Sequence, residues 1–445
     1  MKTIRKVAIA ATTLSLGACE LSLQNPNAPT VEQVTGSVDG VIALATGLQG
    51  RFAESYGNFA YMAGLVTDEF AAVSAALISI SDAEGGSVAP GTGIADNVFN
   101  SVYRTVRTAD DLISNADQLP AEVDAGTKSG LKALAFALKA EALGEALQSY
   151  QRIPINTFGV TEPTYVPRSE SLPYIRGLLD SASNTLAAQA PSAFFNASIL
   201  TPGVSLPNVI NLFKARYARI ANDDAAALAA ANLVSRTTRS VLTYPSPLLN
   251  FYTNVTGGPN GIGPRDQFRT SMEAGDQRAG YFVVATNTVG RVGSLLDTWA
   301  KYTDPRAPLP IYYPDEALLI KAEALARTNQ LAAAQAALDS VRTDCPGGRG
   351  LDDPKACLPP LSGSLSQAQL IAEIYVQRRY ELYSTGLRWE DARRRNAVRG
   401  FAVFPNVPLD AQRCWLPYAI GDRNANPNVP ADPAEPASFP SGCPL

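Results

Sequence analysis

Two segments of this 445-residue chain repeat one pattern, and this repeat constrains the fold more than any other feature of the sequence. Residues 214–234, KARYARIANDDAAALAAANLV, resemble residues 321–341, KAEALARTNQLAAAQAALDSV. Four matches lie at one constant offset: Lys214 and Lys321, Asn222 and Asn329, Ala229-Ala230 and Ala336-Ala337, and Val234 and Val341. Each segment has the pattern of a helix, a tight turn at the asparagine and an alanine-rich second helix, and small side chains let such helices pack closely. The repeat predicts scattered helical pairs of the tetratricopeptide type; a shared alanine-rich composition is the alternative explanation.

Hydrophobic residues recur at helical spacing along most of the remaining chain. The pattern begins after Thr30, and it returns at 93–118 and in the alanine-rich segment 127–149. Further helices are expected at 171–190, 207–221, 224–236, 314–327, 331–343 and 366–385. Strand patterns are few, and Tyr281–Thr286 is the best of them. The sequence therefore predicts an all-α fold of tetratricopeptide-like helical pairs, at about 31–236 and 311–343.

Long stretches without a regular pattern separate these helices, at 237–310, 344–365 and 400–445. Stretches of this length are uncommon in compact domains and often carry function. We therefore expect a loop-rich region at about 237–310 to present the ligand-binding site.

Histidine is absent from the chain, and the formal charge is −4. The absence excludes imidazole bases, histidine-containing triads and the common zinc sites. The charge gives no reason to expect nucleic acid as a partner. Hydrophobic residues make up 46% of the chain, which excludes a disordered polymer.

Residues 1–18 have the features of an export signal. Lys2, Arg5 and Lys6 precede an apolar stretch that is too short to span a bilayer. Residues 16–19, Leu-Gly-Ala-Cys, resemble the bacterial lipobox, in which the cysteine thiol receives a diacylglyceryl group. We therefore expect residues 1–18 to be removed, Cys19 to anchor the chain in membrane lipid, and residues 19–30 to form a tether. An ordinary secretory signal that happens to contain a cysteine is the alternative.

Four other cysteines, Cys345, Cys357, Cys414 and Cys443, are expected to form two disulfides in an exported chain. Three pairings are open. We favour the local one, Cys345–Cys357 with Cys414–Cys443, because each bond would then close a loop rich in proline and glycine. A metal site of four thiolates is the alternative, but the spacing contains no CxxC element. No metal ligand is predicted.

Residues 371–395, IAEIYVQRRYELYSTGLRWEDARRR, form the most distinctive segment of the chain. The pattern predicts an amphipathic helix, a left-handed cap at Gly386, a reversal against which Trp389 packs, and a short arginine-rich helix. Acidic residues within the segment, such as Glu381, Glu390 and Asp391, are available as partners for the arginines. Paired, partly buried guanidinium groups are the favoured interpretation. A basic ligand-binding face is the alternative.

This segment resembles the C-terminal signature of the SusD/RagB family, roughly R-R-x-E-L-x-x-E-G-x-R-W-x-D-L-x-R. The matching residues are Arg378, Arg379, Glu381, Leu382, Gly386, Arg388, Trp389, Asp391 and Arg394. Thr385, Glu390 and Ala392 depart from the signature. Further matches occur in the order of the family, at 25–30, 276–278, 311–342, 416–418 and 426–428.

The resemblance implies a single SusD-like body at 31–445, with about four helical pairs and a signature region at about 344–445. It also implies a function, that of a non-catalytic surface lipoprotein without a cofactor. Such a protein captures nutrient, commonly oligosaccharide, and delivers it to a SusC-like TonB-dependent outer-membrane barrel. The expected location is the bacterial outer membrane, anchored by lipid at Cys19 and facing the cell exterior.

Candidate ligand-binding residues follow from the chemistry of sugar recognition, in which aromatic faces stack on CH groups while amides and carboxylates bind hydroxyls. The candidates are Trp299, Tyr302, Tyr252, Asn250, Tyr61 and Asp68. The first four lie in the loop-rich region, and the last two lie where early helix ends of the family approach the ligand. Core packing is the alternative for the aromatic residues, and a solvated helix end is the alternative for Asp68.

Three functions stay open at this point. The first is the nutrient-binding protein, which exposed aromatic residues at Trp299 and Tyr252 would favour. The second is a surface glycoside hydrolase, which would need two carboxylates about 5–10 Å apart in a cleft. The third is a helical adaptor without a small ligand, which the absence of an aromatic cleft would favour.

Overall fold

The computed structural model describes residues 37–73, 78–84, 88–91, 93–251, 261–291, 293, 295–301, 303–348, 351–396, 413–434 and 443. The expected export signal and tether lie outside the described residues, as do Cys19, Tyr252 and Tyr302.

Four long helices form one half of the scaffold: α3 (Val38–Val66), α5 (Gly93–Ala116), α6 (Ala125–Ser149) and α7 (Arg168–Ala188). Ser37 caps the start of α3, because its hydroxyl accepts a hydrogen bond from the Gly40 amide. α6 is buried along most of its length because its alanines and glycines admit close neighbours. At Gly144 a Cβ atom would lie 1.6 Å from the Tyr217 hydroxyl, so α6 accepts no larger residue there.

The two repeated segments form the same structure. α8 (Leu206–Ile220) and α9 (Asp224–Ala231) are joined at Asn222, and α13 (Asp315–Arg327) and α14 (Leu331–Arg342) are joined at Asn329. Both asparagines are left-handed, with φ of 58° and 61°. The amide that follows each of them returns to the preceding helix, Asp223 to the Ala218 carbonyl (2.9 Å) and Gln330 to the Leu325 carbonyl (2.8 Å). The prediction of tetratricopeptide-like helical pairs is confirmed.

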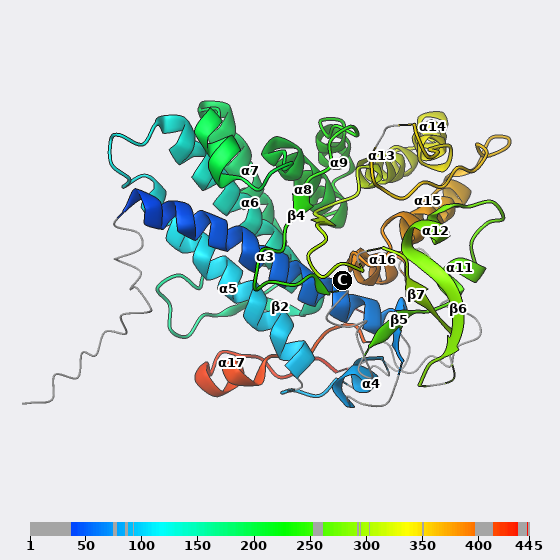
Figure 1. Ribbon diagram of the computed structural model, residues 1–445, viewed down its shortest axis with the longest axis horizontal. Coiled ribbons are helices and arrows are strands. Elements are labelled where there is room, and N and C mark those ends of the chain that lie inside the picture. Colours follow the sequence, from blue (N-terminus) through cyan, green and yellow to red (C-terminus); the bar gives the residue numbers. More distant parts are fainter. Residues whose placement is uncertain are drawn as a thin grey trace, which may run out of the picture.

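The helices α6, α7, α8, α9, α13 and α14 follow one another along one side of the molecule, and each packs against the next (Figure 1). α15 (Gln367–Glu381) packs on α13 and α14, whereas α16 (Leu387–Asn396) returns to α3. The signature segment, which spans α15 and α16, therefore joins the last helical pair to the first helix.

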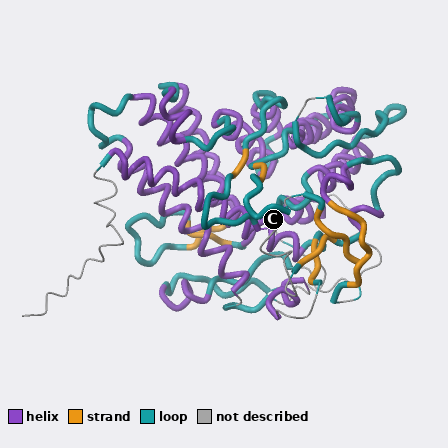
Figure 2. Tube along the Cα trace, viewed as in Figure 1, coloured by secondary structure: helices purple, strands orange, loops and turns teal. Residues whose placement is uncertain are grey.

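Strands are short and occur in pairs around the helices (Figure 2). The antiparallel pairs are β1 (Phe70–Ala72) with β5 (Ile262–Pro264), β2 (Arg152–Pro154) with β3 (Tyr165–Pro167), β4 (Val241–Leu242) with β8 (Leu309–Pro310), and β6 (Val283–Val289) with β7 (Leu295–Trp299). The remaining short helices are α4 (Ile78–Glu84), α11 (Gln267–Thr270), α12 (Arg278–Phe282), α17 (Ile420–Ala425) and the π-helix η1 (Phe195–Ile199).

The expected loop-rich region thus has more regular structure than its sequence suggested. The strand predicted at Tyr281–Thr286 is wrong for its first two residues, because α12 continues to Phe282 and β6 begins at Val283. Pairing with a distant partner creates β5, whose three residues are too few for a periodic pattern.

The cysteines form two disulfides, Cys345–Cys357 and Cys414–Cys443. This is the local pairing that the sequence favoured. The first closes the loop after α14, and the second ties the chain after the signature segment to its C-terminal end.

Candidate functional site

The arginines of the signature segment are buried in ion pairs. Arg378 donates to both carboxylate oxygens of Asp391, at 2.7 and 3.2 Å. Arg219 of α8 bridges Asp391 (2.8 Å) and Glu323 of α13, and Arg394 also reaches Glu323 (3.1 Å). Burial alone would raise the pKa of Glu323, but Arg219, Arg394 and Arg378 outweigh it and lower that pKa to about 2. These contacts join α8, α13, α15 and α16.

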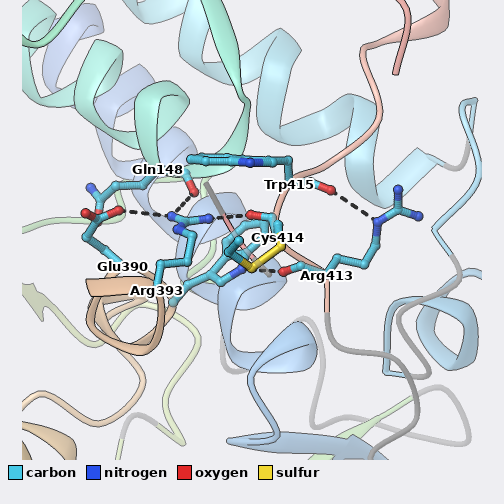
Figure 3. The surroundings of a disulfide bond; sticks show 8 residues. Gln148, Glu390, Arg393, Arg413, Cys414 and Trp415 are labelled. Atoms are coloured by element: carbon cyan, nitrogen blue, oxygen red, sulfur yellow. Dashed lines mark hydrogen bonds and ion pairs between the residues drawn. A yellow bond between two sulfur atoms is a disulfide. The ribbon is translucent and has the colours of Figure 1, made fainter. Parts of the chain in front are cut away.

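Arg393 anchors the end of the same segment to the second disulfide (Figure 3). Its guanidinium is fully buried and lies 4.2 Å from the centre of the Trp415 ring. It donates to the backbone carbonyls of Gln148 and Cys414 and to the Glu390 carboxylate (3.1 Å). The paired guanidinium groups expected from the sequence are therefore confirmed for Arg378, Arg393 and Arg394.

The turn between α15 and α16 fixes the end of α3. Gly386 has φ of +82°, as its predicted role as a left-handed cap requires, and a Cβ atom there would lie 2.6 Å from the Phe59 ring. The Tyr383 hydroxyl donates to the Glu69 carbonyl at 2.8 Å. The signature turn thereby positions the residues that follow α3.

The Glu69 carboxyl is buried beneath this turn, with 3% of its surface exposed. Burial raises its pKa to about 7, although Arg388 and Arg379 act in the opposite direction. Burial and the neighbouring Arg388 in turn lower the pKa of Arg379 to about 10. Glu69 directly precedes the strand β1 in the chain.

We call the strand pairs β1–β5 and β6–β7, together with the buried Asp68 beside them, the candidate binding face. Asp68 supports it from within: its carboxylate lies 3.2 Å from the Arg265 guanidinium, which also pairs with Glu84 (3.1 Å). Glu84 accepts a hydrogen bond from the Ala72 amide in β1 (3.1 Å). Asp68 is 4% exposed, so the solvated helix end considered for it is wrong.

Trp299, the leading aromatic candidate, lies at the end of β7 beneath the same face. It is 7% exposed, and its ring centre lies 5.1 Å from that of Phe70 and 6.1 Å from that of Tyr383. Core packing, the alternative considered for this residue, is the role that the structure shows. A ligand contact by its ring stays a prediction.

The other described candidates lie apart from Trp299. Asn250 is fully buried, and its side-chain amide donates to the carbonyls of Asp304 (2.7 Å) and Ala307 (3.3 Å), so it holds one loop to another. Tyr61 is half-buried on α3, and burial raises the pKa of its hydroxyl. The structure therefore brings only Asp68 and Trp299, among the described candidates, to one face.

The exposed part of the candidate binding face is a strand that the sequence reasoning did not select. Every residue of β6 from Val284 to Val289 is exposed. Behind this strand, Arg269 donates to both oxygens of Asp297 (2.8 and 3.1 Å) and to the Asn287 side chain (3.1 Å). Apolar methyl groups, hydroxyls and an amide are thus presented together. The one available signal was the run of threonine and asparagine among valines at 283–289.

The described residues contain no group of three or more histidine, cysteine, aspartate or glutamate residues that could hold a metal ion. None of their helices is long and apolar enough to cross a membrane.

Comparison with known proteins shows a partial match in sequence and a similarity of fold. Residues 304–412 match the sequence profile of the SusD family. No curated protein matches the chain significantly. Three solved structures illustrate the similarity of fold.

A SusD superfamily protein from Bacteroides thetaiotaomicron has a TM-score of 0.68 at 16% identity, covering 89% of this chain and 100% of that one. A putative sugar binding protein from Bacteroides vulgatus has a TM-score of 0.67 at 16% identity, covering 90% and 99%. Surface glycan-binding protein A from Bacteroides uniformis has a TM-score of 0.66 at 14% identity, covering 87% and 99%. The resemblance seen in the signature segment is confirmed by the match of residues 304–412 to the SusD family, and the fold of the whole chain is similar to that of SusD superfamily proteins.

Proposed function

We propose that this protein is a non-catalytic surface lipoprotein that binds oligosaccharide and delivers it to a SusC-like TonB-dependent transporter. The observation that carries the proposal is the SusD-like fold, which extends over 87% of this chain in the comparison with a surface glycan-binding protein. The lipobox-like residues before Cys19 support the anchor. We propose the bacterial outer membrane as the location and the transporter as the partner.

The described geometry suits recognition by a rigid surface. Asp68, Arg265 and Glu84 tie the end of α3, the β1–β5 pair and α4 together beneath the candidate binding face. Because these ion pairs hold the strands in place, a ligand could bind with little loss of conformational entropy in the protein. The exposed residues of β6 then supply CH groups and hydrogen-bonding groups of the kinds that a neutral sugar uses.

A glycoside hydrolase finds less support at this face. Such an enzyme needs one protonated and one ionised carboxyl group at the scissile bond. Asp68 and Glu84 are buried against one shared arginine, and Asp297 is held at both oxygens by Arg269. None of these three carboxylates is presented to solvent as an acid or a base.

Two measurements, oligosaccharide binding and recovery of the bound sugar, separate the candidate functions, and a third tests the lipid anchor. Oligosaccharides should bind to the purified protein and be recovered uncleaved; a cleaved product would indicate the hydrolase, and no binding across a broad panel would indicate the adaptor. A Cys19→Ala variant should leave the membrane fraction. Continued partition of that variant into detergent would contradict the lipid anchor.

A further inference from the structure

A second polar pocket lies on the helical scaffold, away from the candidate binding face. Its volume is about 380 Å³, and it opens between α7, the turn after α8, and α16. Three arginines and one glutamate are among its lining residues: Arg168, Arg176, Arg394 and Glu390. Ser169 and Asn222 add further polar groups.

The carboxylates near this pocket are shared, so they do not balance its arginines. Glu390 pairs with both Arg168 and Arg393. Burial alone would raise the pKa of Glu390, but Arg168 and Arg393 hold it below its usual value. The Glu390 carboxylate is therefore shared between two guanidinium groups.

The same excess occurs behind Arg394. From Arg394 the ion pairs run through Glu323, Arg219 and Asp391 to Arg378, so this chain of charges begins and ends with an arginine. Arg176 is the exception, since it is paired with Asp223 at 2.6 Å. Arginines thus outnumber carboxylates in the ion-pair network that contains the lining residues Arg168, Arg394 and Glu390.

Two buried guanidinium nitrogens of the lining arginines have no hydrogen-bond acceptor among the described residues. Arg394 uses its two terminal nitrogens for the Ile220 carbonyl, the Asn222 side chain and Glu323, and its Nε has no hydrogen-bond partner among the described residues. The Arg394 residue is 6% exposed. Arg168 donates from Nη2 to Glu390, and its Nη1 likewise lacks a partner in the described part of the chain.

The N-terminus of α7 adds partial positive charge near the pocket. α7 begins at Arg168, and Pro167 before it provides no side-chain cap. The first amides of a helix then lack an intrahelical acceptor and carry partial positive charge. We propose that this pocket binds one compact oxyanion, a phosphate, sulfate or carboxylate group, held by Arg168 and Arg394 with Arg176 at its rim.

Ser169 offers a direct test, because it lines the pocket, is exposed and lies in the first turn of α7. Ser169→Asp places a carboxylate in the pocket, and an acid in the first helical turn is favourable for the fold. Ser169→Asn is the uncharged control of similar size. Titration calorimetry of the intact protein uses inorganic phosphate, inorganic sulfate and galacturonate, with chloride at equal ionic strength and neutral galactose as references.

At least one of the three anions should bind with one ion per molecule, and Ser169→Asp should weaken that binding at least tenfold while Ser169→Asn retains it. Preference for galacturonate would identify an acidic sugar as the source of the anion, and preference for inorganic phosphate a free or esterified phosphate. Arg168→Gln should weaken binding similarly, with partial recovery in Arg168→Lys. Heats no larger than those of chloride, or equal affinity in Ser169→Asp and Ser169→Asn, would overturn the proposal. The pocket is separate from the candidate binding face, so this result does not depend on whether oligosaccharide binds.

Discussion

Arg378 and Asp391 lie 13 residues apart on different helices and form a two-point ion pair, with donor–acceptor distances of 2.7 and 3.2 Å. Arg219 of α8 contacts the same carboxylate, so Asp391 links the signature segment to a helical pair that is distant in sequence. These signature residues therefore connect the C-terminal helices to an earlier helical pair.

Replacing Asp391 with asparagine should destabilise the protein by about 3–5 kcal/mol, because two buried guanidinium groups would lose their shared charge. The free energy of unfolding in urea measures the effect. Glu54→Gln is the control, since Glu54 pairs with Arg104 at a site where the two side chains are 40% and 51% exposed. A loss for Asp391→Asn as small as that of the control, which should stay below about 1 kcal/mol, would contradict the role of this pair.

Replacing Gly386 with alanine should cost more stability than the same change at Gly363. Both glycines are left-handed, with φ of 82° and 72°, so both variants carry backbone strain of roughly 1–2 kcal/mol. Only at Gly386 would the new methyl group meet Phe59, at 2.6 Å, whereas no atom lies within 4 Å at Gly363. Thermal melting of the two variants compares them directly, and equal losses would show that the contact with α3 is unimportant.

Glu69 should make the protein less stable as the pH rises from about 4.5 to 7. Its pKa is raised from 4.5 to about 7 in the folded state by burial, so the folded state holds a proton that the unfolded state releases. The stability that this proton provides is complete below pH 4.5, and its loss at neutral pH amounts to about 3 kcal/mol, since a tenfold change in proton affinity is worth about 1.4 kcal/mol.

Glu69→Gln should remove this part of the pH dependence. Glu323 acts in the opposite direction at lower pH, since its pKa of about 2 means that stability is lost as the pH falls below about 4.5. Urea unfolding of the wild-type protein and Glu69→Gln at several pH values separates the two effects. Parallel stability curves for the two proteins between pH 4.5 and 7 would refute the assignment to Glu69.

Trp299→Ala should lower the free energy of unfolding by about 3–5 kcal/mol, because the ring packs against Phe70 and Tyr383 and is 7% exposed. Phe158→Ala is the control, since its side chain is 45% exposed and should cost less than about 1 kcal/mol. A stable Trp299→Ala variant that binds oligosaccharide weakly would restore Trp299 as a ligand contact.

Local sequence patterns predicted the scaffold because the residues of each helix and turn themselves favour that structure. The alanine-rich run of α6 favours helix by itself, and Asn222 and Asn329 tolerate the left-handed turn that joins each pair. The capping position of Gly386 was predictable for the same reason.

The candidate site depended on contacts between distant residues, which no local pattern contains. Phe70 pairs with Pro264 to form β1 and β5, and Arg265 reaches back to Asp68. The sequence could not distinguish core packing from a ligand contact for Trp299, because its packing partners come from other elements, β1 and the signature turn. The exposed surface of β6 became evident only when its pairing with β7 was known.

Binding of the purified protein to a glycan array that spans neutral and acidic oligosaccharides tests the proposed function most directly. We expect saturable binding to at least one oligosaccharide class, with the bound sugar recovered intact. Absence of binding to every glycan on the array, or recovery of cleaved sugar, would contradict it.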